Sequence, residues 1–187
     1  MSFSLSEKSL KALGEIKSRY PKSKSAVMPA LYLVQEELGM INEEAINLVA
    51  ELLDYSPIHV KELVTFYTMY YAKPVGKYHF QVCRTLSCAL RGSKDITQTL
   101  KDKFGINPHE VTEDGLFSYE QVECLGSCGT APMCEINDTY FENLTSEKLL
   151  TIIDRIEKEQ PDLRFSTSKD KLGEGFSDLP KSEIMED

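Results

Sequence analysis

Four of the five cysteines lie in two closely spaced pairs. Cys83 and Cys88 have four residues between them, and Cys124 and Cys128 have three. Each pair lies where a predicted strand runs into a loop, so a fold that joins the two loops presents four thiols to one site. Thiolates are the usual protein ligands of iron–sulfur clusters and of structural zinc. The residues therefore predict a metal centre with these four cysteines as ligands.

The spacing within the pairs favours iron over zinc. Structural zinc favours two to four intervening residues, commonly two in a tight knuckle. Cysteinyl iron–sulfur clusters accept wider gaps, including one of four residues. A [2Fe–2S] cluster is therefore the leading interpretation, and zinc stays open as an alternative. A disulfide framework is disfavoured because nothing in the sequence indicates secretion, and a thioredoxin-type redox pair needs two intervening residues, which neither pair has.

The fifth cysteine, Cys134, lies in an alternating segment that is typical of a strand. Free cysteine packs as a small hydrophobic residue. The four ligands that a cluster needs are already supplied by the two pairs. We therefore expect Cys134 to be a packing residue and not a ligand.

A cluster in the two loops needs groups that tolerate its negative charge. With four thiolates, an oxidised [2Fe–2S] centre carries a charge of about −2. Gly126 and Gly129 allow backbone amides to approach the sulfurs, and Arg84 and Arg91 flank the first pair. The alternative is that both arginines are solvated surface residues.

The chain before the cysteines predicts an N-terminal helical bundle over residues 1–72. Amphipathic repeats indicate four helices. Ser6 and Asn42 can cap the first and third helices, and Gly39 is a stop signal for the second. Ser56-Pro57 is a start signal for the fourth.

The apolar residues of this half are predicted either to contact a partner or to form the core. Phe66, Met69 and Tyr70 lie beyond the core stripes and are candidates for contact with a partner. The core positions predicted for the first helix are Leu10, Leu13, Ile16 and Tyr20.

After a linker at residues 73–77, the pattern changes to an α/β domain over residues 78–158. The predicted order is strand, helix, strand, strand, strand, helix. The elements are strands at 78–83, 116–123, 133–136 and 139–142, and helices at 88–104 and from Thr145 onward. Residues 159–187 have too few apolar side chains for a core. We expect them to form a polar tail, disordered or strapped on a partner.

Composition excludes several functional classes. The net charge is −9, with 41% hydrophobic and 27% charged residues, which argues against nucleic acid as a partner. The sequence has no apolar run long enough to span a bilayer, and its N-terminal residues lack the pattern of a signal peptide. It also lacks a glycine fingerprint for nucleotide binding.

The histidines, His59, His79 and His109, are scattered, and each is expected on the surface or in the core. The expected compartment is the cytoplasm.

Several motifs together resemble the 24 kDa subunit family of respiratory complex I, whose bacterial members belong to NADH:quinone oxidoreductase. The resemblance covers roughly residues 10–157. It is carried by Cys83–Gly92, Thr112–Phe117, Cys124–Cys128 with Ala131-Pro132, Asn143–Thr145, and in the helical half by Leu38–Ile41 and Thr65–Tyr67.

The resemblance implies a thioredoxin-like [2Fe–2S] ferredoxin domain behind a helical docking domain. The family's four ligands map onto Cys83, Cys88, Cys124 and Cys128. The cluster would exchange single electrons with the FMN of a tightly bound, NADH-oxidising flavoprotein subunit, so FMN and NADH would not bind to this chain. Other partners would be further subunits of the peripheral arm, which lies on the cytoplasmic side of the inner membrane. The isolated chain would do no catalytic chemistry.

Three alternatives remain open. Diaphorase subunits of NAD-linked hydrogenases and formate dehydrogenases share the cysteine pattern and are also electron-transfer subunits. A zinc-stabilised interaction module would use the same cysteines as a structural site. A free-standing thioredoxin-like ferredoxin is disfavoured, because a soluble carrier would not need the helical half.

Overall fold

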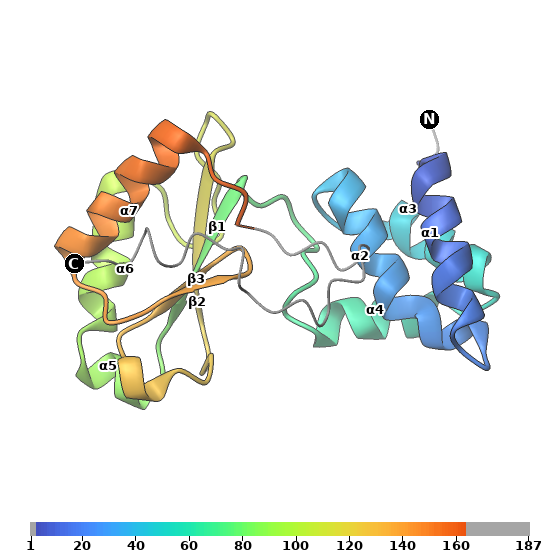
Figure 1. The fold of residues 1–187 in the computed structure, drawn as a ribbon, viewed down its shortest axis with the longest axis horizontal. Helices are drawn as coiled ribbons and strands as arrows, with labels where there is room; N and C mark the ends of the chain where they lie inside the picture. The colour runs from blue at the N-terminus through green and yellow to red at the C-terminus, as the bar shows by residue number, and fades with distance from the viewer. Residues whose placement is uncertain (1–2, 164–187) are drawn as a thin grey trace. The chain divides into compact units, whose positions relative to one another are not determined.

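A computed structural model describes residues 3–163, which form two compact units. Within these residues, one unit ends at Pro74 and the other begins at Val75 (Figure 1). Each unit has a hydrophobic core of its own. Among the described residues, the structure contains no helix that is both long and apolar enough to cross a membrane.

The first unit is helical throughout. It contains α1 (Glu7–Ser18), a short 3-10 helix (Ser23–Ala26), α2 (Val27–Leu38), α3 (Glu43–Leu53) and α4 (Pro57–Phe66). The side chains of Ser6 and Asn42 accept hydrogen bonds from the first turns of α1 and α3, as predicted. Gly39 ends α2 with φ +75°, which a glycine adopts without strain. Ser56 precedes α4 without a side-chain cap.

The core of this unit differs from the prediction at three positions. Leu13 and Ile16 are buried, but Leu10 is 43% and Tyr20 is 40% exposed. Leu10 and Tyr20 lie at the edges of the predicted stripe, and Tyr20 is beyond the end of α1, so neither reaches the core. Tyr70 is only 5% exposed, and its hydroxyl donates to the carbonyl of Met28 at 3.1 Å. The predicted partner contact of Tyr70 is therefore wrong, because this side chain completes the core.

The second unit contains a four-stranded sheet in the order β2-β1-β3-β4. The strands are β1 (Tyr78–Cys83), β2 (Phe117–Val122), β3 (Cys134–Ile136) and β4 (Thr139–Phe141). β1 runs parallel to β2 and antiparallel to β3, and β3 forms a hairpin with β4. These are the four predicted strands, with the hairpin turn at Asn137 in a left-handed conformation.

Two helices, α6 (Ser93–Phe104) and α7 (Ser146–Glu159), pack on one face of this sheet (Figure 1). The core between them is formed by Phe80 and Tyr119 of the sheet and by Leu100 and Ile153 of the helices, all completely buried. Alternate residues of a strand point to opposite faces, so these strands direct one set of side chains toward the helices. Thr145 caps α7 through its hydroxyl, as predicted.

The predicted helix over residues 88–104 is two helices. α5 (Leu86–Leu90) is followed by α6, and Gly92 lies between them with φ +99°. A residue with a side chain rarely adopts this conformation, whereas glycine does so readily. The glycine turns the chain, so α5 is a separate short helix that carries Cys88.

The segment after α7 is anchored to the second unit. Pro161 accepts a hydrogen bond from the Tyr78 hydroxyl at 2.8 Å through its carbonyl. The carbonyl of Leu163 accepts from the amide of Asp138 at 3.1 Å, and the Leu163 side chain is 2% exposed. Residues 160–163 thus pack against this chain. The rest of the predicted tail, residues 164–187, lies outside the described residues.

Candidate metal centre

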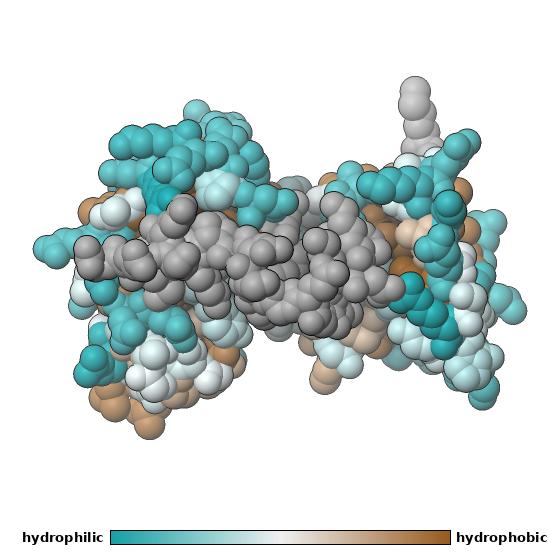
Figure 2. Space-filling model, in the orientation of Figure 1, coloured by the Kyte–Doolittle hydropathy of each residue, from teal (hydrophilic) through white to brown (hydrophobic). Residues whose placement is uncertain are grey.

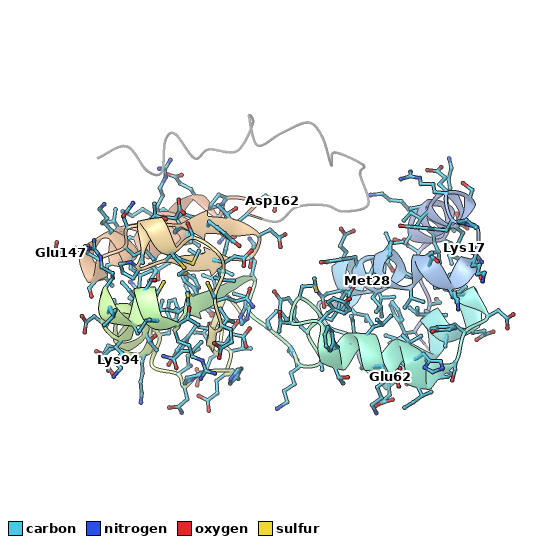
Figure 3. The ribbon with its side chains drawn as sticks, turned by 90° about the horizontal axis from the view of Figure 1, so that it is seen from below. Lys17, Met28, Glu62, Lys94, Glu147 and Asp162 are labelled. Carbon is cyan, nitrogen blue, oxygen red and sulfur yellow. The ribbon has the colours of Figure 1, made fainter. Side chains whose placement is uncertain are left out.

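The two cysteine pairs meet where β1 and β2 end. Cys83 is the last residue of β1 and lies opposite Val122, the last residue of β2. Because the two strands are parallel, the loops that follow them leave the sheet at the same edge. The first loop leads into α5 with Cys88, and the second contains Cys124 and Cys128. Figure 3 shows yellow sulfur atoms inside this unit, which carries the labels Lys94 and Glu147.

The sulfur atoms are arranged as two pairs. The Sγ atoms of Cys124 and Cys128 are 3.6 Å apart, and Cys83 lies close enough to Cys88 for its charge to raise the pKa of that thiol. Two thiolates on one tetrahedral metal are about 3.8 Å apart if each metal–sulfur bond is about 2.3 Å long. A [2Fe–2S] cluster takes four thiolates, two on each iron, so this donor set fits it. In the described part of the chain, no group of three or more His, Cys, Asp or Glu side chains is placed to hold a single metal ion.

The two pairs differ in burial. Cys83 is 2% and Cys88 is 1% exposed, and both pack against Ala131 and Met133. Cys124 and Cys128 are exposed. The candidate centre therefore has an inner side within the protein and an outer side at the surface.

Cys83 and Cys88 form the buried, inner pair, and Cys124 and Cys128 form the exposed, outer pair. A backbone amide donates to the outer pair. The amide of Gly126, where φ is +86°, donates to the sulfur of Cys124 at 3.4 Å. This hydrogen bond lowers the pKa of Cys124. The pKa of Cys128 is raised, mainly because its thiol shares a hydrogen bond with Cys124. The approach of an amide to a sulfur, predicted from the glycine-rich loop, is confirmed at Gly126.

Similar donors surround the inner pair. Burial raises the pKa of Cys83, but hydrogen bonds from the Thr85 hydroxyl at 3.2 Å and from the amides of Thr85 and Leu125 outweigh it, so the pKa is lowered. Burial raises the pKa of Cys88 to about 11, although the amide of Met133 acts in the opposite direction. Donors to a sulfur stabilise its negative charge, which a cluster also needs.

The two arginines near the inner pair are surface residues. The guanidinium of Arg84 donates to the carboxylate of Glu123 at 2.6 Å, and both side chains are more than half exposed. Arg91 is also exposed. These positions agree with the alternative that both arginines are solvated.

Cys134 lies in the core, as predicted. It is 0% exposed, and its register partners are Val82 on β1 and Phe141 on β4. Its thiol contacts the carbonyl of Glu135 at 3.5 Å, and burial raises its pKa. It packs with the residues under α6 and α7 and not with the cluster of Cys83, Cys88, Ala131 and Met133.

Two of the histidines that were expected to be scattered share one partner. His79 Nε2 and His109 Nδ1 lie 3.2 and 3.3 Å from the carboxylate of Glu120, which also accepts from Gln81 at 2.8 Å. Burial raises the pKa of Glu120, but these hydrogen bonds and charges outweigh it and lower the pKa. The parallel register of β1 and β2 brings His79, Gln81 and Glu120 to one face. The signal in the sequence was the period-two spacing of polar residues within two strands.

The comparison with known proteins shows the family of the chain. Residues 13–157 match the model of the thioredoxin-like [2Fe-2S] ferredoxin family, so the chain belongs to this family. Its fold and its [2Fe–2S] cofactor, expected from the resemblance, are thereby confirmed.

Within the family, the chain is similar to subunits of one oxidoreductase. It is 46% identical over 157 residues to the E subunit of the NADH-quinone oxidoreductase of Rickettsia bellii, an alignment that covers 82% of this chain and 94% of the relative. It is 44% identical over 144 residues to subunit 2 of the NADH-quinone oxidoreductase of Thermus thermophilus, which covers 75% of this chain and 80% of the relative.

A solved structure shares the fold. The crystal structure of an NAD+-reducing [NiFe]-hydrogenase in the air-oxidized state superposes with a TM-score of 0.64 at 19% identity, over 76% of this chain. This chain covers 24% of the hydrogenase chain. At this identity the similarity shows the fold alone.

Proposed function

We propose that the chain is an electron-transfer subunit of an NADH:quinone oxidoreductase, with one [2Fe–2S] cluster bound by Cys83, Cys88, Cys124 and Cys128. The observation that carries this proposal is the convergence of the two sulfur pairs at the edge where β1 and β2 end. The names of the relatives support the assignment to this oxidoreductase. When bound, such a cluster accepts and releases single electrons.

The residues of this chain bind and insulate the cluster. The amide of Gly126 donates to the sulfur of Cys124, and the amides of Leu125 and Met133 lower the pKa values of Cys83 and Cys88, so all three favour the thiolates. The burial of Cys83 and Cys88 excludes water from one side. The exposed outer pair leaves the other side open for electron exchange with a partner.

The partner in this proposal is a flavoprotein subunit that binds FMN and oxidises NADH, together with further subunits of the peripheral arm. An apolar surface on α5 supports a contact near the cluster, since Leu86 is 75% and Leu90 is 78% exposed on the helix that carries Cys88. Figure 2 shows hydrophobic residues at the end of the unit where Figure 1 draws α5. Large exposed apolar residues that gather in one place often mark a contact surface.

The same proposal assigns the docking role to the helical half, residues 1–72. Phe66 is 78% and Ile58 is 58% exposed on α4, and Met69, shortly after this helix, is 38% exposed. Through its partner subunits, the chain would be held on the cytoplasmic side of the inner membrane.

A second candidate is the equivalent subunit of an NAD-linked hydrogenase. The solved NAD+-reducing [NiFe]-hydrogenase shares the fold over 76% of this chain, so the fold is compatible with this candidate. Both candidates use the same cluster and differ in the partner. Identification of the proteins that copurify with the native chain separates them, since quinone-reducing and hydrogen-oxidising complexes contain different subunits.

The test of the cofactor is the composition of the freshly isolated native protein. We expect about two irons and two acid-labile sulfides per chain, as a [2Fe–2S] centre requires. Reduction should produce the EPR signal of one unpaired electron. Stoichiometric zinc without labile sulfide would identify a structural zinc site and exclude the proposed function.

A further inference from the structure

The loop that carries the outer cysteine pair is held by Glu142, the residue after β4. Its Oε1 atom accepts hydrogen bonds from the hydroxyl of Ser127 and from that of Thr130, the latter at 2.6 Å. The two hydroxyls are themselves 2.7 Å apart. Ser127 immediately precedes Cys128, and Thr130 closes the 3-10 helix that begins at Cys128. The carboxylate of Glu142 thus binds hydroxyls on both sides of Cys128, a proposed cluster ligand.

Neighbours of Glu142 hold the same loop through its backbone. The Tyr140 hydroxyl donates to the carbonyl of Leu125 at 2.9 Å. The amide of Asn143 donates to the carbonyl of Thr130 at 2.7 Å. The amide of Gly126, the next residue of this loop, in turn donates to the sulfur of Cys124 at 3.4 Å. The segment after β3 therefore fixes the loop whose amides face the sulfurs.

The carboxylate of Glu142 also brings charge to the site. It is half-buried, so solvent screens its field less than at an exposed position. Burial and then the charges of Glu135, Cys124 and Glu142 raise the pKa of Tyr140, so both Glu142 and Cys124 lie within electrostatic range of one hydroxyl. A negative charge near an anionic cluster disfavours the addition of an electron.

We propose that Glu142 is a positioning residue that holds the Cys124–Thr130 loop and lowers the reduction potential of the cluster. This inference rests on the proposed binding of a [2Fe–2S] cluster by the four cysteines. The hydrogen bonds act on the loop through Ser127 and Thr130, and the charge acts on the cluster directly.

The experiment compares two substitutions of Glu142 in the full chain. Glu142→Gln keeps an oxygen that accepts from the two hydroxyls and removes the charge, whereas Glu142→Ala removes both. The midpoint potential is measured by redox titration with EPR detection, and loop retention by the rate of iron release to a chelator. Glu142→Gln should have a more positive midpoint potential and release iron as the wild type does. Glu142→Ala should share the positive shift and release iron several-fold faster.

Two further variants separate charge from position. Tyr140→Phe removes a loop contact without a change of charge, so it should release iron faster at the wild-type potential. Glu113→Gln removes an exposed carboxylate in the turn before β2, at the opposite end of that strand from Cys124, and should match the wild type in both measurements.

An unchanged potential in Glu142→Gln would overturn the electrostatic role. Iron release from Glu142→Ala at the wild-type rate would overturn the positioning role. If Glu142→Ala does not fold, Thr130→Val decides the positioning role in its place, because it removes a hydroxyl that Glu142 binds and keeps the size of the side chain. Iron release at the wild-type rate from this variant would then count against the positioning role. A wild-type chain without iron and sulfide would instead refute the proposed function, which this experiment thereby distinguishes from the inference on Glu142.

Discussion

At the scale of single residues, the surroundings of the five cysteines divide them into two groups. Cys83, Cys88, Cys124 and Cys128 have backbone amides or hydroxyls as hydrogen-bond partners, or share a hydrogen bond within their pair. Cys134 lies in the apolar core, where burial raises its pKa although the amide of Gln81 acts in the opposite direction. Donors stabilise a thiolate and its cluster, whereas an apolar environment favours the neutral thiol.

Substitution of single cysteines tests this division. Replacement of any of the four paired cysteines by alanine should abolish or strongly destabilise the cluster, because one iron then lacks a thiolate. The matched control, Cys134→Ala, should keep the visible absorption and EPR spectra and lose on the order of 1 kcal/mol of folding stability. Iron loss in Cys134→Ala with iron retained in Cys128→Ala would show that the ligands are assigned wrongly.

The pKa of Glu135 predicts how the folding stability of the protein depends on pH. Burial, and then the charge of Asp138, raise its pKa to about 7, above the ordinary value of 4.5. The folded state thus binds a proton more tightly than the unfolded state, so this residue reduces stability increasingly as pH rises from about 4.5 to about 7. Glu135→Gln should therefore stabilise the protein more at pH 8 than at pH 5, measured by urea unfolding. Equal effects at both pH values would contradict the raised pKa.

The parts of the site that the sequence predicts are those whose residues lie close together along the chain. The cysteine pairs stand out because ligands within a loop are close along the chain. Glu142 is not visible in this way, since its partners are 12 and 15 residues distant and a carboxylate–hydroxyl contact has no periodic pattern. The contact of His109 with Glu120 likewise depends on how a loop packs beside β2.

At the scale of elements, the approach of the chain before β1 to strand β2 depends on one glycine. A Cβ atom at Gly76 would overlap the backbone of Phe117. The amide of Gly76 donates to the Ser118 hydroxyl at 2.8 Å. The sequence shows Gly76 only as part of a linker that also contains a proline. Its packing role is hidden there, because a close approach between backbones leaves no pattern in the residue types.

Gly76→Ala should therefore destabilise the second unit. The added methyl meets backbone atoms that cannot rotate away, and overpacking of this kind costs about 1–3 kcal/mol. Thermal unfolding should show a lower midpoint. Gly14→Ala is the control, since a Cβ there has no neighbouring atom within 4 Å and the residue lies in α1 of the other unit. A midpoint for Gly76→Ala equal to that of the control would show that the strand moves aside easily.

The elements themselves were largely predictable. Helix caps at Ser6, Asn42 and Thr145 and the stop at Gly39 lie where the sequence signals placed them. The break at Gly92 was not predicted, because a single glycine inside an amphipathic run is also compatible with a continuous helix. In the structure, Gly92 adopts φ +99° and Cys88, on the short helix before it, packs with Ala131 and Met133.

At the scale of the whole molecule, the two units have separate cores, and all four paired cysteines belong to the second. A chain without residues 1–72 should therefore keep its iron and sulfide and bind the proposed flavoprotein partner more weakly. The comparison of affinities with the full chain, for example by surface plasmon resonance, measures the contribution of the helical unit. Equal affinities would show that this unit does not dock the partner.

The parallel pairing of β1 and β2 also has a consequence for the order of folding. Cys83 pairs with Val122 only after the chain between β1 and β2 has brought the two strands together. Pairing between residues that are distant in the sequence forms slowly. During synthesis or refolding, the chain therefore exists first with two separate dithiols and only later with the assembled set of four. Cluster insertion is expected to follow the closure of the sheet, and its rate should track the recovery of strand structure rather than that of helix.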